Sequence, residues 1–306
     1  MAVTASPCTL CPRMCGARRD EGEMGLCGAG KDMAVARAAL HFWEEPPLSG
    51  AAGSGAVFFS HCPLHCLYCQ NGTIASGRAG WPVTRERLAE ICLDLQEKGA
   101  LNVNFVTPTH YSLQIRDAVA QARDLGLRVP VVWNTSGYER AEVIEALRGV
   151  VDVYLADFKY ADAELARLYS NAPDYPEVAL EAIGKMVECA GAPRFDEVDG
   201  QARMTGGVIV RHLLLPGALE NSKRSIELLW ERFGTSVEYS IMNQYTPVIE
   251  GHPQLSETVP PKDYERLLDF ADALGIEDYY WQEGPAAEES FIPAWDGSGV
   301  QPKTDF

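Results

Sequence analysis

The chain has 306 residues, of which 46% are hydrophobic and 23% are charged. This composition is typical of a folded protein with room for one large α/β domain and a small additional module. The net charge of −17 argues against general affinity for nucleic acid or anionic membranes. The N-terminus has no apolar signal segment, and no run approaches the roughly 18 apolar residues of a membrane span, so we expect a cytoplasmic protein.

The N-terminal segment is rich in cysteine. Cys8, Cys11, Cys15 and Cys27 form a C-x2-C-x3-C-x11-C pattern among turn-forming glycines. In a chain without an export signal, such cysteines favour a metal or redox site over disulfides. Because no core-forming periodicity lies between them, we predict that a metal organises this segment. Zinc and a [4Fe-4S] cluster both accept four thiolates. Zinc is the simpler structural use, whereas a cluster would be able to relay electrons.

A small basic group, Arg13, Arg18 and Arg19, lies inside this segment. An ordinary solvated patch is the simpler interpretation. The functional alternative is a docking site for an acidic electron donor such as flavodoxin or ferredoxin, because opposite charges steer such encounters at low salt.

The middle of the chain predicts a parallel sheet covered by helices. Residues 29–55, with several Pro and Gly residues, are predicted to be an irregular linker. Beyond them, apolar runs alternate with helical patterns, and Cys92 and Cys189 are predicted to be small core residues of two such helices. Alternating strands and helices imply right-handed β-α-β units with the active site at the carboxyl ends of the strands. The predicted strands are residues 56–60, 101–106, 129–134, 151–157, 207–215, 236–242 and 278–281.

A second cysteine motif follows the first predicted strand. Cys62, Cys66 and Cys69 have C-x3-C-x2-C spacing, with no fourth cysteine nearby. Three thiolates can hold three corners of a cubane cluster and leave the fourth iron open. A zinc knuckle would need a fourth local ligand, and buried thiols rarely cluster in this way. An open iron can be chelated by S-adenosylmethionine (SAM), whose one-electron cleavage supplies a 5′-deoxyadenosyl radical.

This motif, with Tyr68 before its last cysteine, resembles the radical SAM superfamily signature. The resemblance implies a partial (β/α)6 barrel, a SAM-binding [4Fe-4S] cluster on the three cysteines, and Tyr68 near the adenine of SAM. The implied domains are a metal-binding module with its linker (residues 1–48), the barrel (residues 49–283) and a C-terminal tail (residues 284–306) held by Phe291, Ile292 and Trp295.

Polar residues close each predicted strand, which predicts a lined cavity at one rim. Across these strand ends, residues 56–247 resemble the glycyl-radical-enzyme activating enzymes. The whole chain resembles the group labelled PflX-like more closely. The shared motifs include Thr-Pro-Thr-His (107–110) and Asn-Thr-Ser-Gly-Tyr (134–138). Resemblance to this group does not imply a particular substrate.

The activating-enzyme resemblance assigns further site residues. Asn134, Thr135 and Asp157 fall where those enzymes hold a cation beside SAM, although Asn replaces an Asp at 134. Lys159 falls on a lysine that faces the SAM carboxylate, and Arg211 would be able to pair with the same group.

The chain departs from the family at the end of the second strand. The Gly-Gly-Glu motif that binds the SAM amino group in the family is absent. Thr107 and Thr109 occupy this position, and they would be able to accept hydrogen bonds from the amino group. His110 and His212, together with Lys159 and Arg211, are the predicted catalytic residues, the two histidines being the best general acid/base candidates.

We therefore predict a radical SAM oxidoreductase that abstracts a hydrogen atom from a protein or peptide partner, with flavodoxin or ferredoxin as electron donor. A first alternative is a small-metabolite radical SAM enzyme, whose tight cavity would be lined by His110, Arg211 and Asn243. A second is a non-catalytic iron–sulfur or zinc scaffold, which the missing Gly-Gly-Glu keeps open. The lack of a basic RNA-binding domain disfavours a nucleic-acid substrate.

Overall fold

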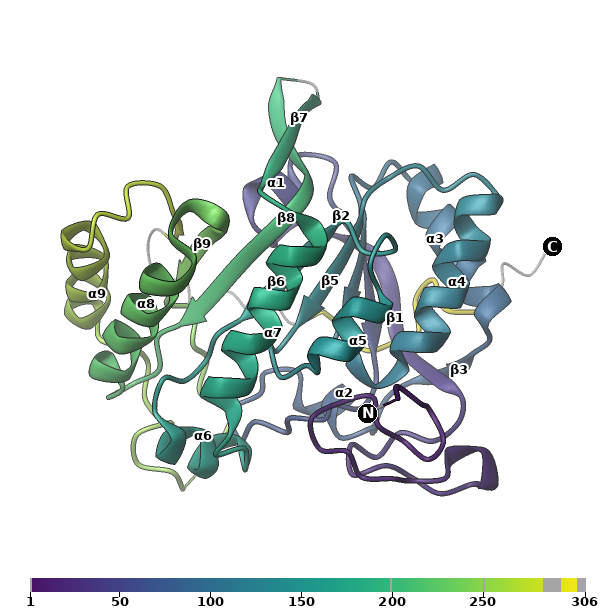
Figure 1. Cartoon of the computed structure of the whole chain (residues 1–306), viewed down its shortest axis with the longest axis horizontal. Helices are drawn as coiled ribbons and strands as arrows, with labels where there is room; N and C mark the ends of the chain where they lie inside the picture. Colours follow the sequence, from purple (N-terminus) through teal and green to yellow (C-terminus); the bar gives the residue numbers. More distant parts are fainter. Residues whose placement is uncertain (1, 199, 250, 283–292, 302–306) are drawn as a thin grey trace.

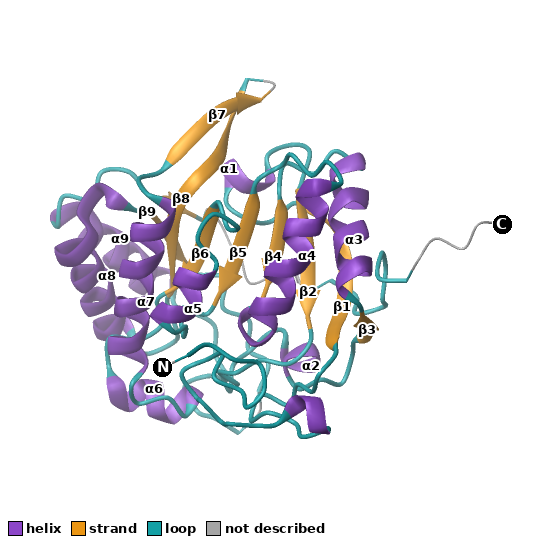
Figure 2. Cartoon of the chain, turned by 45° about the vertical axis from the view of Figure 1, so that its right-hand side comes forward, coloured by secondary structure: helices purple, strands orange, loops and turns teal. Residues whose placement is uncertain are grey.

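A single sheet organises the fold in the computed structural model, which describes residues 2–198, 200–249, 251–282 and 293–301. Its ten strands run in the order β10-β9-β8-β6-β5-β4-β2-β1-β3, with β7 paired to β8. The strand path does not return on itself, so the sheet is an open, partial barrel, as predicted. The helices cover its outer face (Figure 2).

The parallel part of the sheet comprises seven strands, and all seven strand predictions are confirmed. Each residue of β2 is buried, because the strand lies inside the sheet and is covered on both faces. A strand in this position has a nearly continuous apolar sequence. The bounds are β2 Ser54–Phe59, β4 Val103–Val106, β5 Val131–Thr135, β6 Val153–Asp157, β8 Gln201–Leu213, β9 Glu238–Met242 and β10 Tyr280–Trp281.

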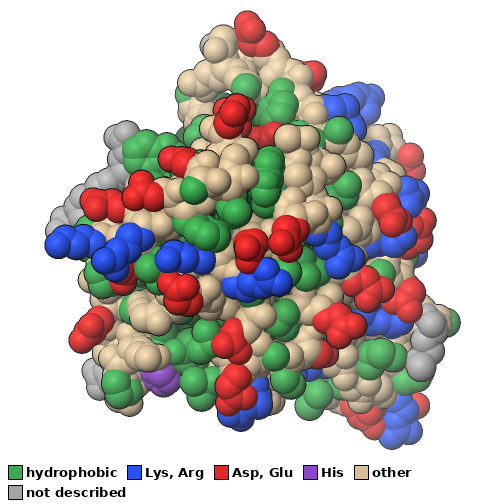
Figure 3. All heavy atoms as spheres, turned by 60° about the vertical axis from the view of Figure 1, so that its left-hand side comes forward, with side chains coloured by type: hydrophobic (Ala, Val, Ile, Leu, Met, Phe, Trp, Pro, Cys, Tyr) green, Lys and Arg blue, Asp and Glu red, His purple; other side chains and the backbone are tan. Residues whose placement is uncertain are grey.

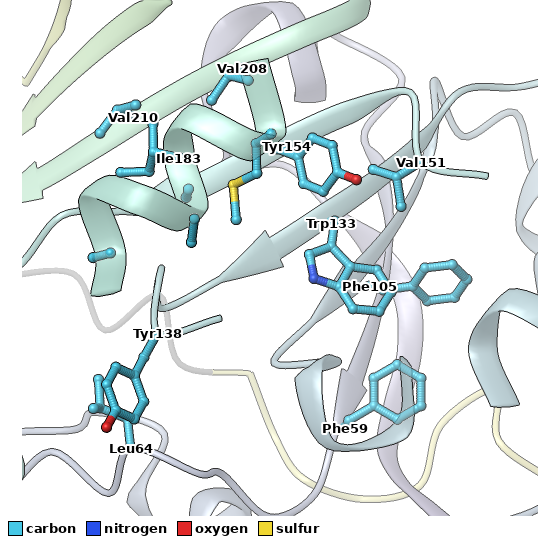
Figure 4. Close-up of a cluster of buried hydrophobic side chains, with 14 of the residues drawn as sticks. Phe59, Leu64, Phe105, Trp133, Tyr138, Val151, Tyr154, Ile183, Val208 and Val210 are labelled. Atoms are coloured by element: carbon cyan, nitrogen blue, oxygen red, sulfur yellow. The ribbon is translucent and has the colours of Figure 1, made fainter. Parts of the chain in front are cut away.

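The helices bury one apolar face each against these strands. In α3, the Thr84 side chain caps the first turn by accepting from Arg87 N, and Cys92 is buried in the core, as predicted. Figure 4 shows the packing between Trp133 of β5, Tyr154 of β6 and Ile183 of α7. The bounds are α1 Pro46–Ser49, α2 Gly72–Ala75, α3 Arg85–Glu97, α4 Ser112–Asp124, α5 Ala141–Ala146, α6 Ala163–Ser170, α7 Tyr175–Ala190, α8 Leu219–Phe233 and α9 Pro261–Ala273.

The prediction of an irregular linker over residues 29–55 is wrong. This stretch contains β1 (Met33–His41), which pairs antiparallel with β2, and β3 (Trp81–Val83) pairs antiparallel with β1. The alanines of β1 give it little strand propensity of its own, so pairing with the buried β2 decides its conformation. A second unpredicted feature is β7 (Arg194–Val198), which forms a projecting hairpin with the long β8 (Figure 1).

The described part of the C-terminal tail returns to the antiparallel edge of the sheet. Trp295 packs edge-on against Phe58 with ring centroids 5.2 Å apart, and Asp296 pairs with Arg37 at 2.9 Å. The predicted contact of Trp295 is therefore confirmed, whereas Phe291 and Ile292 lie outside the described residues.

The surface of the α8 and α9 side carries acidic and basic side chains next to one another (Figure 3). Within the described ranges, no helix combines the length and apolar character needed to cross a membrane.

Candidate active site

A cavity lies at the carboxyl ends of the parallel strands, where the predicted strand-end residues come together. Cys62, Cys66 and Cys69, hereafter the cavity cysteines, line it from the loop after β2. The predicted residues that also line it are Tyr68, Thr107, Asn134, Thr135, Asp157, Lys159 and Arg211. The structure does not bring Thr109, His110, His212 or Asn243 to this cavity.

The cavity cysteines sit on a tightly wound loop with protein donors around their sulfurs. The Leu64 amide donates to Cys62 Sγ at 3.4 Å, and the Ser170 hydroxyl donates to Cys66 Sγ at 3.1 Å. Burial raises the pKa of Cys62 to about 11 and that of Cys69 to about 12, with neighbouring thiols adding to the effect. Metal binding must therefore release protons from this loop.

The number of thiols at the cavity suits a cluster with one open iron. In the part of the chain that the structure describes, no three His, Cys, Asp or Glu side chains converge as ligands of one metal ion. A cubane binds each thiolate through a different iron, so its ligands lie farther apart than those of a single ion. Three thiols on one loop, lining one cavity with no fourth beside them, fit a [4Fe-4S] cluster with an open iron.

A buried charge network lies beside the cavity cysteines. Lys159 Nζ lies 2.6 Å from Asp157 Oδ2, and Arg211 Nε donates to Asp157 Oδ1 at 3.0 Å. Burial opposes ionisation of Asp157, but the two cations outweigh it and lower the pKa of this carboxyl. Burial likewise opposes the charge of Lys159, and Asp157 outweighs it to raise the pKa of the ammonium. The Asp157 carboxylate thus fixes two cations, Lys159 and Arg211, at the site.

Glu44 completes this network, although sequence reasoning missed it. Its Oε2 accepts from Arg211 Nη1 at 3.1 Å, and its Oε1 accepts from Asn104 at 2.9 Å and Asn134 at 3.1 Å. The residue follows β1 in the stretch predicted to be a linker. The only local signal is an acidic pair after two exposed aromatic residues, which does not by itself indicate a buried site.

The comparisons with known proteins agree with this geometry. The profile described as the Radical SAM superfamily matches residues 56–196, which include the cavity cysteines and the ends of β4, β5 and β6. Residues 56–196 therefore carry a radical SAM domain. This domain supports an enzyme, and the superfamily implies a [4Fe-4S] cluster and SAM as cofactors.

One curated relative aligns with most of this chain. It is the uncharacterized protein MJ0674 of Methanocaldococcus jannaschii, 27% identical over 284 residues that make up 89% of this chain and 76% of the relative.

Two solved structures share the fold. A radical SAM methyltransferase from Sphaerobacter thermophilus aligns with a TM-score of 0.51 and 14% identity, over 75% of this chain and 65% of that one. Streptococcus suis SuiB bound to S-adenosylmethionine aligns with a TM-score of 0.50 and 15% identity, over 73% of this chain and 48% of that one. This chain thus spans less than two thirds of either protein, and the likeness extends to the radical SAM fold alone.

The side chains predicted to hold a cation beside SAM are hydrogen-bonded to other protein groups. Both Asp157 oxygens are taken by Lys159 and Arg211, and Asn134 Oδ1 accepts from Arg211 Nη2 at 2.7 Å. Thr135 is turned to Glu139, to which it donates at 2.7 Å. The guanidinium therefore occupies the acceptors that a bound cation would use.

Thr107 occupies the position of the missing Gly-Gly-Glu motif, and its backbone is strained. Its φ of +58° lies in the left-handed region, which a β-branched residue rarely adopts. Its amide donates to Asn134 O at 2.9 Å, which holds the strand end against β5. The Thr109 hydroxyl instead donates to Glu139 Oε1 at 2.7 Å. The Asn243 backbone N–H donates to Gln282 Oε1 at 3.1 Å.

The two histidines predicted as general acid/base candidates are buried away from the cavity. His110 Nε2 lies 2.8 Å from Ser60 O, and His212 Nδ1 lies 2.6 Å from Phe158 O. Burial lowers the pKa of His110 to about 3 and that of His212 to about 4. Both rings are therefore neutral core residues that bind backbone carbonyls, and the geometry does not support a catalytic role.

Tyr68 lines the cavity, and its hydroxyl belongs to a polar chain that ends on the cluster loop. Its oxygen lies 2.8 Å from Tyr160 Oη, which lies 2.7 Å from Ser170 Oγ. Ser170 in turn donates to Cys66 Sγ, as described above. The chain orients the ring and the thiol together, while the predicted contact of Tyr68 with adenine stays a prediction.

The basic group predicted as a solvated patch or docking site is dispersed. Arg13 donates to Pro63 O at 3.1 Å, and Arg19 is only 4% exposed and donates to His110 O at 2.6 Å. Only Arg18 faces solvent, and Glu21 and Glu23 neutralise it. Two of the three arginines thus hold the N-terminal segment onto the barrel, and no basic docking patch forms.

Glu139, behind the cavity wall, predicts a pH dependence of stability. Burial raises its pKa to about 7, against three hydrogen bonds that favour the carboxylate. The folded state therefore keeps a proton that the unfolded chain releases near its ordinary value of 4.5, so stability is lost as the pH rises between these values. We expect Glu139→Gln to remove this loss, about 3 kcal/mol in the free energy of unfolding.

Chemical denaturation of the metal-free protein at several pH values between 4.5 and 7 measures the effect. Glu164→Gln, at an exposed acidic residue of α6, is the control and should keep the wild-type pH slope. An unchanged slope in Glu139→Gln would contradict the prediction.

Proposed function

We propose that this protein is a radical SAM oxidoreductase that cleaves SAM reductively and abstracts a hydrogen atom from a protein or peptide partner. The observation that carries the proposal is that the three cavity cysteines, Lys159 and Arg211 line the same cavity. When bound, the cluster and SAM supply the one-electron chemistry that yields the 5′-deoxyadenosyl radical.

The residues of the cavity bind and orient the cofactors. The cavity cysteines would hold the cluster, and the ammonium of Lys159 lies within electrostatic reach of all three sulfurs. A carboxylate chelating the open iron would therefore meet the two fixed cations, Lys159 and Arg211. Their Asp157 and Glu44 partners hold them in place before SAM arrives, so little ordering cost is left for binding.

The rim of the cavity favours a macromolecular substrate over an enclosed metabolite. Trp43 lines the cavity and is 58% exposed, and Leu67 of the cluster loop is 49% exposed. Exposed apolar side chains at a site rim suit contact with another polypeptide. The resemblance of residues 56–247 to the glycyl-radical-enzyme activating enzymes supports the same substrate class. Of the three residues that the metabolite alternative places around its cavity, Arg211 lines the cavity described here, whereas His110 and Asn243 are not among its described lining residues.

The proposal is tested on protein purified without oxygen, reconstituted with iron and sulfide, and incubated with SAM and dithionite. We expect 5′-deoxyadenosine and methionine in equal amounts. A reduced, spectroscopically intact cluster that binds no SAM would contradict the proposal and favour the scaffold alternative.

The substrate class is tested by adding lysate of the source organism, separated by mass. Faster 5′-deoxyadenosine formation with the high-mass fraction, lost after protease treatment, supports a protein or peptide partner. Stimulation by the low-mass filtrate alone would overturn that part and favour a metabolite.

A further inference from the structure

The four cysteines Cys8, Cys11, Cys15 and Cys27, hereafter the N-terminal cysteines, have no part in the proposed reaction. We propose that they bind a second [4Fe-4S] cluster, which passes single electrons to the cluster on the cavity cysteines. A low-potential one-electron donor protein reduces the second cluster, which is reoxidised as the electron leaves for the cavity. The electron is consumed when the carbon–sulfur bond of SAM breaks. Electron delivery rests on the proposed function, whereas cluster binding does not.

The first observation is that the fold gathers these thiols from both ends of a 20-residue stretch (residues 8–27). Each of the four thiols lies near at least two of the others, and Cys15 packs against the buried Cys8. Each sulfur also accepts from the backbone amide of the residue two positions further on. Amides that point at sulfur stabilise metal-bound thiolates and tune their clusters.

The second observation is a buried cation that faces the thiols. Arg19 donates to Cys27 Sγ at 3.4 Å and to His110 O, and its Nε is buried without a partner. Among the described residues, neither hydrogen-bond acceptor of this guanidinium is a carboxylate. A guanidinium is always charged, and burying it is costly without a counter-charge. Four thiolates on a metal centre supply the negative charge that Arg19 otherwise lacks.

The proposed relay requires a redox centre, which favours a cluster over zinc, the reverse of the preference from sequence. Zinc has no redox chemistry, so a zinc ion on these thiols would not pass an electron. A [4Fe-4S] cluster also accepts four thiolates, one on each iron, and does take up and release single electrons.

The third observation is that the two cysteine loops are in contact. The His61 ring packs on Gly28, where an added Cβ would lie 2.8 Å from Nδ1. His61 directly precedes Cys62, and Gly28 directly follows Cys27. Figure 1 shows the N-terminal loops against the carboxyl-end rim of the sheet, close to α2. The N-terminal segment thus offers a short path between solvent and the cavity.

Iron counting in a variant without the cavity site tests cluster binding independently of SAM chemistry. With the cavity cysteines changed to alanine, the reconstituted protein should still bind about four irons and four sulfides per chain. Reduction should produce an electron paramagnetic resonance signal of a [4Fe-4S] centre. One zinc and no iron, or no metal at all, would overturn the proposal.

Electron delivery is tested with Cys11→Ser/Cys27→Ser, which keeps the cavity cysteines. Reduced flavodoxin should drive 5′-deoxyadenosine formation several-fold more slowly than in the wild type, while dithionite, which reaches the cavity directly, should drive it at the wild-type rate. Equal losses with both reductants would overturn the relay. Absence of activity in the wild type with both reductants would instead count against the proposed function and leave the iron count as the test of the second site.

Discussion

Cys66→Ala is expected to abolish 5′-deoxyadenosine formation and to remove about four irons per chain. Cys66 is the middle ligand of the three, and its sulfur is held by the Ser170 hydroxyl at 3.1 Å. Because no fourth cysteine lines the cavity, two thiolates are left to hold the cluster. The loss of activity should therefore be complete rather than partial.

The matched control for this variant is Cys189→Ser. Cys189 lies in α7, half-buried and away from the cavity lining, so its loss should leave both iron content and activity at the wild-type level. Circular dichroism should show that both variants are folded, since a truncated loop cysteine removes little apolar contact. Persistent SAM cleavage in Cys66→Ala would mean that these thiols do not hold the catalytic cluster.

Arg211→Met is expected to lower the free energy of unfolding by about 3 kcal/mol, because it leaves buried carboxylates without their cation. The Arg211 side chain is 15% exposed, and those of Glu44 and Asp157 are 7% and 17% exposed. Asp157 keeps Lys159 as a partner, whereas Glu44 keeps only amide donors. Most of the cost should therefore come from Glu44.

A double-mutant cycle with Glu44→Gln isolates that cost. The double variant should be more stable than the sum of the single changes predicts, by about 1 to 3 kcal/mol. Arg224→Met is the control, because Arg224 is 52% exposed in its pair with Glu227 on α8 and should contribute at most about 1 kcal/mol. Additivity within about 0.5 kcal/mol would show that Glu44 and Arg211 are not coupled.

The same cycle has a functional readout. SAM binding by the reconstituted variants should weaken with Arg211→Met, since one of the two cations proposed to pair with the SAM carboxylate is lost. Glu44→Gln alone keeps both cations and should weaken binding less. Isothermal titration without reductant separates this loss of binding from any loss of cleavage.

Local patterns in the sequence were sufficient for the parallel sheet and the cluster loop. Apolar runs of strand length, alternating with helical periodicity, predict the seven parallel strands. The spacing of Cys62, Cys66 and Cys69 predicts the cluster ligands. These features can be predicted because hydrophobic periodicity and ligand spacing are set by residues only a few positions apart. Parallel strands also bring their carboxyl ends to one rim, which predicts where the strand-end residues lie.

Only the tertiary structure decided which polar side chains face the cavity and which are buried behind it. Glu44 reaches Arg211 across 167 positions of sequence, and Arg19 reaches His110 across 91. As a result, Glu44, in a predicted linker, is part of the site, and Arg19, in a predicted surface patch, is buried. Polar partners so far apart leave no period or spacing in the chain, because their interaction depends on distance in the folded molecule rather than along the sequence.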